Sequence, residues 1–448
     1  MKSLIREQGD QSPQLKKLLE SQPGSSVTTK FFFDRVLANQ EDGLVILRFH
    51  ATQQLGYVYV VWSRAREPQR LKILEGLFRV GAGTSRGERN PQDASEIAVT
   101  RKAQVLFPCA PRSPVIASVH VEGNPIEPFR SHGDLWLSTW ADDDCMYSAW
   151  GDGFGVVQVA KRIAKGVHLT DCGIVKLKGT LPKLEVEEIC FDAPTADTTA
   201  NDKPSSLLFI DGRLYGHFHS PLGDAWIGYL AYSDDYGRTW KRVGFYREWE
   251  KAPKGASPWC RDRNSPFRCL FFINMGKNYE LNTDGYVYGL GIGMEWSWRG
   301  GVYLARVPKK EILDYQAYQY FTGMKDGQPG WSRCQFDGVP LPGVSIPDQG
   351  SAMYHPGVKR YLFLTRCELY DAPTPWGPWT YAGSWLTEKV PEQWHGGYQP
   401  GIISKDAGPD YFWFTISGQN RKPNITYNLI LGKIVMKLRK GNDRTGGH

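Results

Sequence analysis

The 448-residue chain has no apolar run that approaches the length of a transmembrane helix. Its eight cysteines form no CxxC pair and no cluster with histidine, which argues against a zinc site. No block of Lys and Arg is interleaved with a nucleic-acid motif, so the net charge of +7 indicates only a mildly basic surface. We therefore expect no membrane span, no nucleic-acid partner, no bound metal and no cofactor.

The first ten residues, Met1–Asp10, lack the apolar segment of a secretory signal, so a signal peptide is not expected. The compartment stays open: the start fits a cytoplasmic protein, and a secreted or cell-envelope protein fits if the start is wrongly assigned. Cys260 and Cys269 are close enough in sequence to form a loop disulfide in an oxidising compartment. The alternative is that all the cysteines are reduced and mostly buried.

What the chain has in abundance is aromatic residues, glycine and proline. Aromatics make up 13% of the chain, with 48 Gly and 29 Pro, a combination typical of many short strands joined by tight turns. Between residues 112 and 436 apolar strands and Gly/Asp turns recur in units of roughly 40–60 residues, the spacing of propeller blades. We expect an all-β, five-bladed β-propeller over residues 106–440, closed by an upstream strand in the last blade because closure removes exposed edges.

The rest of the chain is expected to be peripheral to this domain. Residues 1–105 are predicted to be an irregular, partly disordered N-terminal extension with extra strands at Phe31–Val36, Leu44–Phe49 and Tyr57–Trp62. Residues 441–448 are predicted to be a flexible tail. One short peripheral helix is expected over Pro308–Tyr320, because it starts with Pro, carries early charge and ends before a glycine.

The segment Ser233–Trp240 matches the Asp-box pattern S-x-D-x-G-x-T-W in full. In such a hairpin the Ser and Asp side chains bond turn amides, Gly adopts a positive φ and Trp packs on the blade. Asp boxes usually lie away from the substrate. The chain has a single box and no recognisable sialidase arginine triad, so the motif supports a propeller and not a sialic-acid substrate.

Carboxylates gather around one short apolar strand in the first expected blade. Cleavage of a glycosidic bond needs one carboxylic acid and one carboxylate, and aromatic faces can hold sugar rings. Each Asp alone is as readily a turn cap, but the cluster with its Trp neighbours favours an active site. The candidate catalytic residues are Asp134, Asp152 and Asp142, and the neighbouring candidate sugar-binding rings are Trp136 and Trp150.

Further candidate substrate-binding residues lie in later blades. Glu295 and Trp296 form an acid beside an aromatic platform, although Glu295 is equally explained by an ion pair with a nearby Arg. Residues at the start of innermost propeller strands converge on the central pocket, so Gln349, His395, Tyr398 and Gln399 could hydrogen-bond substrate hydroxyls. Each of these four alone could be an ordinary turn residue.

His217 and His219 occupy alternate positions after a predicted strand and therefore share one face. Such a pair could bind a metal or a hydroxyl-rich ligand, but a structural role is the more common one.

Three ordered segments resemble domain-of-unknown-function family 4185: Trp140–Gly153, Val302–Pro308 and Ala372–Trp379. That family is similar to glycoside hydrolase family 183, whose members include endo-D-arabinanases acting on mycobacterial arabinan. The resemblance covers residues 112–436 and implies a five-bladed propeller whose pocket surrounds the acids of the first blade. It also implies Asp134 and Asp152 as the catalytic pair, with Asp142 as a pKa modulator or substrate ligand.

The expected function is therefore an endo-acting glycoside hydrolase that cleaves a polysaccharide, with D-arabinan as the implied substrate. One Asp of raised pKa protonates the leaving oxygen, and the other, ionised, activates water or attacks the anomeric carbon. Asp134 as base and Asp152 as acid is the starting assignment, with the roles open to exchange, and inversion is favoured over retention. The alternatives are a non-catalytic, lectin-like propeller that binds carbohydrate and a scaffold that binds protein.

Overall fold

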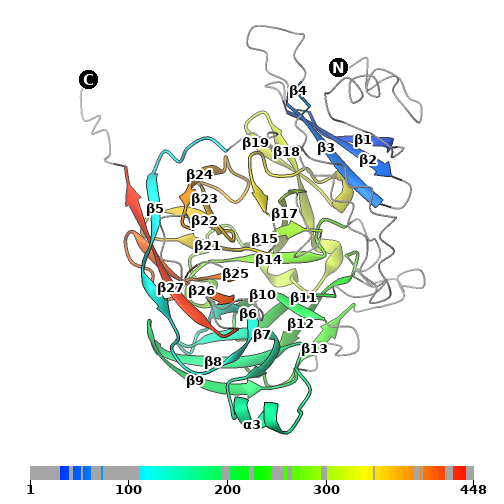
Figure 1. Ribbon diagram of the computed structural model, residues 1–448. Coiled ribbons are helices and arrows are strands. Elements are labelled where there is room, and N and C mark those ends of the chain that lie inside the picture. Colours follow the sequence, from blue (N-terminus) through cyan, green and yellow to red (C-terminus); the bar gives the residue numbers. More distant parts are fainter. Residues whose placement is uncertain are drawn as a thin grey trace, which may run out of the picture.

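The chain is described by a computed structural model (Figure 1). The described residues are 31–39, 44–51, 54–61, 72–73, 110–193, 202–220, 227–244, 257–259, 265–293, 300–346, 349–386, 394, 397–418 and 427–439. Strands dominate these residues, and the single α-helix among them, α3, spans Val159–Ala164. The prediction of an all-β propeller is confirmed.

The first two blades are four-stranded antiparallel sheets. The first contains β6 (His132–Trp140), β7 (Met146–Gly155), β8 (Gly173–Thr180) and β9 (Lys183–Cys190). The second contains β10 (Lys203–Ile210), β11 (Arg213–Ser220), β12 (Ile227–Ser233) and β13 (Lys241–Val243).

The third and fourth blades are joined into one sheet by a short parallel pairing of their first strands, β14 and β21. The third contains β14 (Cys269–Asn274), β15 (Tyr286–Ile292), β17 (Tyr303–Pro308), β18 (Gln319–Lys325) and β19 (Gln328–Ser332). The fourth contains β21 (Ser351–His355), β22 (Arg360–Leu364), β23 (Glu368–Ala372) and β24 (Thr380–Ser384). The short strands β16 (Gly300–Gly301) and β20 (Ser345–Ile346) pair with each other, and the 3₁₀ turns η2 and η5 span Lys277–Tyr279 and Gln335–Asp337.

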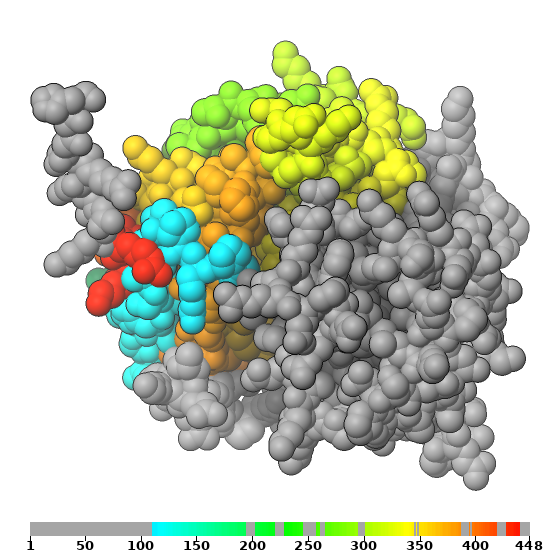
Figure 2. Space-filling model, turned by 90° about the horizontal axis from the view of Figure 1, so that it is seen from above, coloured from blue at the N-terminus to red at the C-terminus, as the bar shows by residue number. Residues whose placement is uncertain are grey.

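The fifth blade combines the two ends of the propeller sequence. Its strands are β25 (Gly397–Ile403), β26 (Tyr411–Gly418), β27 (Ile430–Leu438) and β5 (Ile116–Ile126). β5 pairs antiparallel with β27, so the chain's upstream strand supplies the outer edge of the last blade. Figure 1 shows cyan β5 beside red β27, and Figure 2 shows the same two segments in contact at the surface. This is the closure expected from the sequence.

The innermost strands β6, β10, β14, β21 and β25 each contact the next, and β25 returns to β6. Their burial follows from this position. Every residue of β10 is buried, as are the seven central residues of β6, whereas the outermost strand β9 alternates between exposed and half-buried residues. Innermost strands are packed on both faces by neighbouring blades, so their burial is continuous rather than alternating, even at polar residues such as Ser205 and Ser206.

The predicted helix over Pro308–Tyr320 is wrong. β17 continues to Pro308, two 3₁₀ turns follow at Lys309–Glu311 (η3) and Tyr315–Ala317 (η4), and β18 begins at Gln319. The Asp314 side chain accepts a hydrogen bond from the Gln316 amide at 2.9 Å and caps a new turn, which ends any continuous helix. The helix that does form, α3, follows β7 and was not predicted.

The Asp box forms the expected hairpin between β12 and β13. Asp235 accepts hydrogen bonds from the Thr239 amide at 2.8 Å and the Thr239 hydroxyl at 2.6 Å, and Ser233 accepts one from the Gly237 amide at 2.8 Å. Gly237 has a φ of 90°, and the Trp240 indole donates to its carbonyl at 2.9 Å. These bonds are all local to the hairpin, which confirms the structural interpretation.

Outside the propeller, β1 (Phe31–Asn39), β2 (Leu44–Ala51), β3 (Gln54–Val61) and β4 (Lys72–Ile73) form a separate four-stranded antiparallel sheet. The first three correspond to the strands predicted in the N-terminal extension, whose packing on the propeller stays a prediction. The tail at 441–448 lies outside the described residues. Cys269 is a free, buried thiol, so the suggested disulfide with Cys260, itself outside the described residues, is not formed. Within the described part of the chain no helix is long and apolar enough to span a membrane.

Candidate active site

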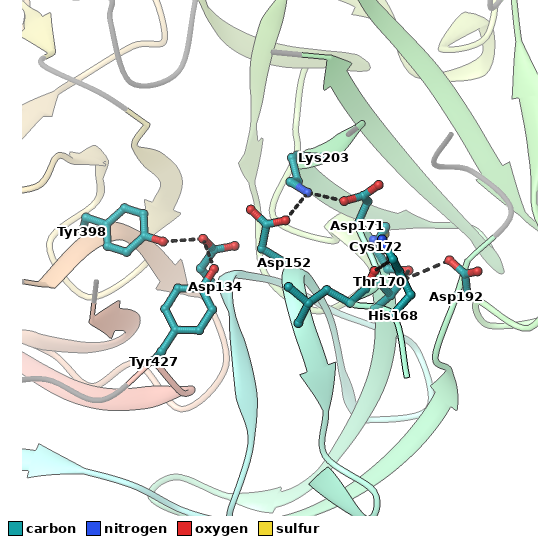
Figure 3. A network of polar contacts seen from close by, with 11 residues as sticks. Asp134, Asp152, His168, Thr170, Asp171, Cys172, Asp192, Lys203, Tyr398 and Tyr427 are labelled. Atoms are coloured by element: carbon teal, nitrogen blue, oxygen red, sulfur yellow. Dashed lines mark hydrogen bonds and ion pairs between the residues drawn. The ribbon is translucent and has the colours of Figure 1, made fainter. Parts of the chain in front are cut away.

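The candidate site lies where the innermost strands begin. These strands run in the same direction around the propeller axis, so their first residues meet at one end of it. Asp134 is the third residue of β6, Lys203 the first of β10 and Tyr398 the second of β25. Figure 3 shows these side chains and Asp152 gathered in one network.

The backbone around Asp134 and Asp152 departs from regular strand geometry. The pairing of β6 with β7 shifts register on both sides of Asp134, and Asp152 has a left-handed φ of 45°. Such irregularities change the direction of side chains and are common beside active sites. A Cβ on Gly153 would lie 2.1 Å from the His132 carbonyl oxygen, so glycine at this position of β7 is required for the close approach of the two strands.

Asp134 is a buried carboxyl, with the residue only 6% exposed. Its Oδ2 accepts hydrogen bonds from the hydroxyls of Tyr398 and Tyr427, the latter at 2.8 Å. Its Oδ1 is buried without a hydrogen-bond partner among the described residues. Burial raises the pKa of Asp134 to about 7, and the charge of Asp152 acts in the same direction, whereas the two tyrosines and Lys203 lower it.

Asp152 has a different environment. Its Oδ1 lies 2.7 Å from the Lys203 ammonium, and its side chain is 42% exposed. The same ammonium lies 2.6 Å from Oδ1 of Asp171, and the Lys203 side chain is 1% exposed. Burial alone would lower the pKa of Lys203, but the two carboxylates outweigh it and raise that pKa. Lys203 is therefore a buried cation that lies between the carboxyl groups of Asp152 and Asp171.

The two neighbouring carboxyl groups thus have different environments. Burial favours the protonated form of Asp134, whereas Asp152 lies in an ion pair with Lys203. Pairs of acids whose environments separate their protonation states are the arrangement that general acid–base catalysis requires.

The expected sugar-binding role of Trp136 and Trp150 does not fit the structure. Both residues are at most 1% exposed, and their rings stack on each other with centroids 5.5 Å apart. The Trp136 indole donates to the Gly133 carbonyl at 2.9 Å. They fill the core beneath the β6–β7 hairpin, so neither presents a face to a ligand.

Asp142 lies in the turn at the other end of the β6–β7 hairpin. Asp134 and Asp142 are eight positions apart in sequence, which corresponds to about 26 Å along an extended strand. Asp142 is exposed and accepts a hydrogen bond from the Tyr236 hydroxyl at 2.9 Å. The structure therefore brings Asp134 and Asp152 together and leaves Asp142 outside their site.

Of the other candidates, Gln349 and Gln399 are buried at the end of the axis that holds Asp134. Gln399 follows Tyr398 in β25, has a left-handed φ of 54°, and its Oε1 has no hydrogen-bond partner among the described residues. Their roles in substrate binding stay predictions. Glu295, Trp296 and His395 lie outside the described residues.

Three site residues were not predicted: Lys203, Asp171 and Tyr427. Lys203 could have been found, because it begins an innermost strand and meets the criterion that selected Gln349 and Gln399. Asp171 and Tyr427 come from connections that carry no motif, and only the fold brings them to Asp134 and Asp152.

The histidine pair on β11 is structural. The Leu270 amide donates to His217 Nδ1 at 3.4 Å, and the His217 ring contacts that of Trp259 with centroids 5.3 Å apart. His219 Nδ1 lies 2.6 Å from the Ser205 hydroxyl oxygen. Within the described residues there is no group of three or more His, Cys, Asp or Glu side chains arranged to hold a metal ion.

Comparisons with known proteins identify a family but no characterised relative. A family model described as "Domain of unknown function (DUF4185)" matches residues 132–432. No curated protein matches the chain.

Several solved structures resemble this chain at low sequence identity. RS223 β-xylosidase is 13% identical, with a TM-score of 0.41 over 71% of this chain and 96% of its own. The catalytic domain of the Coprinopsis cinerea GH62 α-L-arabinofuranosidase is 10% identical, with a TM-score of 0.41 over 72% and 97%. The PQQ-bound aldose sugar dehydrogenase of Streptomyces coelicolor is 9% identical, with a TM-score of 0.38 over 73% and 100%. Likenesses at this level carry no argument about activity.

Proposed function

This chain belongs to the DUF4185 family, and we propose that it is a glycoside hydrolase with Asp134 and Asp152 as its two catalytic carboxylates. The observation that carries the proposal is the contrast between them: a buried carboxyl whose pKa is raised to about 7 lies beside a carboxylate ion-paired with Lys203 at 2.7 Å. Glycosidic cleavage needs one group in each state.

The contrast favours Asp134 as the acid and Asp152 as the base, which exchanges the roles first assigned from the sequence. Because Oδ2 of Asp134 accepts two tyrosine hydroxyls, the proton is carried by Oδ1. When that proton moves to the leaving oxygen, the new carboxylate keeps both hydroxyl bonds. Hydrogen bonds of this kind favour the charged form, so Tyr398 and Tyr427 stabilise Asp134 as it loses its proton.

Asp152 completes the reaction in an inverting mechanism. It accepts a proton from water while the water oxygen attacks the anomeric carbon and the bond to the leaving oxygen breaks. Lys203 holds the carboxylate of Asp152 in position for this transfer. A retaining reaction would use Asp152 as the nucleophile instead, and the anomeric form of the first product distinguishes the two.

The finer proposal is endo-acting cleavage of D-arabinan. It rests on the resemblance of the sequence motifs to glycoside hydrolase family 183, while the acid pair itself fits glycosidic bonds in general. The exposed carboxylate of Asp152 beside the buried acid Asp134 indicates no preference for a particular sugar.

The test is hydrolysis of arabinogalactan and lipoarabinomannan by the wild type and by Asp134→Asn and Asp152→Asn. Asp142→Asn is the matched control, because it removes a carboxylate from the other end of the same hairpin. We expect the wild type and the control to release oligosaccharides and each site variant to lose about 10²–10⁴-fold in kcat.

Two results would contradict this proposal. Folded Asp134→Asn or Asp152→Asn protein with undiminished hydrolysis would remove the pair from the mechanism. Glycan binding by the wild type without release of any product, on a broader polysaccharide panel as well, would establish the lectin-like alternative.

A further inference from the structure

A groove lies beside the acid pair, on the boundary between the first and fifth blades. It is formed by the connection from β5 to β6, by α3 and by the segment that precedes β27, and its volume is about 560 Å³. That volume is within the range of small-molecule sites. Its lining residues include Glu127, Phe129, Arg130, His132, Ile163 and Asn428.

One wall of the groove is shared with the environment of Asp134. The His132 ring meets the Tyr427 ring edge-on, with centroids 5.2 Å apart, and the Tyr427 hydroxyl donates to Asp134 at 2.8 Å. Gly133, between His132 and Asp134, donates its amide to the Tyr427 carbonyl at 3.0 Å. Asn428 follows Tyr427 directly. The rings of His132 and Tyr427 therefore connect the groove to Asp134.

The chemistry of the lining suits a neutral ligand with many hydroxyls. Glu127 and Arg130 carry opposite charges, and burial lowers the pKa of His132, so the groove has no net charge near neutral pH. Carboxylate and guanidinium groups can bond hydroxyls as acceptor and donor respectively. Phe129 and Ile163 add apolar faces, and Ile163 is 49% exposed although it is a large aliphatic residue.

We propose that this groove is an additional subsite that binds the glycan chain next to the bond being cleaved. The occupant is a neutral run of sugar units of the substrate itself. The assignment rests on the proposed function, because it gives the acid pair a chain to act on. It follows that the enzyme distinguishes long from short substrates, as endo-acting hydrolysis requires.

The test compares kcat/KM on a long and a short oligosaccharide prepared from the same polysaccharide. Arg130→Ala and Ile163→Ser both alter exposed groove residues, so folding is preserved. Met324→Ala is the matched control, because Met324 is 53% exposed on β18, in the third blade. We expect the long-to-short ratio of kcat/KM to fall about tenfold in both groove variants, mainly through KM, and to stay unchanged in the control.

A second measurement separates this inference from the proposed function. The same variants are made in Asp134→Asn protein, and binding of the long oligosaccharide is titrated. Weaker binding in the groove variants supports the subsite even if no hydrolysis is found for the wild type. An unchanged kcat/KM ratio together with unchanged binding overturns the subsite, whether or not Asp134 proves catalytic.

Discussion

Replacing Asp134 by Asn should stabilise the protein at alkaline pH while it abolishes hydrolysis. A free aspartate has a pKa of 3.8, and burial raises that of Asp134 to about 7. The folded state therefore holds a proton that the unfolded state has released. The contribution of Asp134 to stability is therefore fully present below pH 3.8 and is lost as the pH rises to about 7, because over that range the unfolded state releases the proton while the folded state keeps it.

The magnitude follows from the two pKa values. At 1.36 kcal/mol per pH unit, a rise from 3.8 to about 7 corresponds to a loss of roughly 4 kcal/mol once the pH exceeds 7. Asparagine has no such titration, and its amide oxygen can still accept the hydroxyls of Tyr398 and Tyr427. In a domain of this size each kcal/mol shifts Tm by at most about 2 °C, so the relative gain of the variant between pH 4 and pH 8 is up to about 8 °C.

The assay is thermal unfolding of the wild type and Asp134→Asn across pH 4 to 8.5. Asp371→Asn is the control: Asp371 is fully buried but ion-paired with Arg360 at 2.7 Å. Breaking a buried pair costs about 3–5 kcal/mol, so this variant should be less stable than the wild type throughout the neutral range. A difference in Tm between wild type and Asp134→Asn that does not change with pH would refute the raised pKa and with it the assignment of Asp134 as the acid.

Four further predictions follow from the described contacts. Lys203→Met should reduce both kcat/KM and Tm, whereas Lys405→Met, which also removes a buried and ion-paired lysine, should reduce Tm alone. Tyr427→Phe removes a hydrogen bond that lowers the pKa of the acid, so the alkaline limb of the pH–rate profile should move to higher pH. Gly153→Ala should unfold the hairpin or abolish activity, seen by circular dichroism and hydrolysis, because its Cβ would clash with backbone. Asp235→Ala should lower Tm through loss of about 0.5–1.5 kcal/mol per hydrogen bond to Thr239 and leave kcat unchanged.

The fold could be predicted to the level of blades because its signals are local. The Asp box closes on itself within eight residues, and continuously apolar segments such as Leu207–Ile210 identify innermost strands. The prediction of a helix over Pro308–Tyr320 was wrong because the local sequence pattern does not show that this segment can instead pair as a strand with a distant part of the blade. Tyr320 pairs with Ala305 across β17 and β18, and that pairing outweighs the helical tendency of the segment.

The acid pair could be predicted because both residues lie in one hairpin. Asp134 and Asp152 are neighbours across β6 and β7, so a short sequence window contained both. Tyr398 and Tyr427 lie 264 and 293 positions away from Asp134, and no local pattern connects them to it. The rings of Trp136 and Trp150 were misassigned because composition cannot distinguish a ring in the core from one on a sugar-binding surface. That distinction depends on which side of the sheet the neighbouring blade covers.

Acidic residues lie at both ends of the β6–β7 hairpin. As the pH rises, those in the turn stabilise the folded chain, whereas Asp134 at the other end destabilises it. In the turn, a hydrogen bond from Lys405 holds the pKa of Asp144 below its ordinary value, and at Asp143 the bonds from Lys176 and Tyr147 outweigh burial to the same effect. These carboxylates stabilise the folded chain as the pH rises. At the other end, burial raises the pKa of Asp134, and that acid destabilises the chain under the same conditions. Packing alone does not explain why an acid that opposes folding lies where the innermost strands converge. A requirement for a proton donor at that point explains it, because the burial that lowers stability also keeps the proton on Asp134.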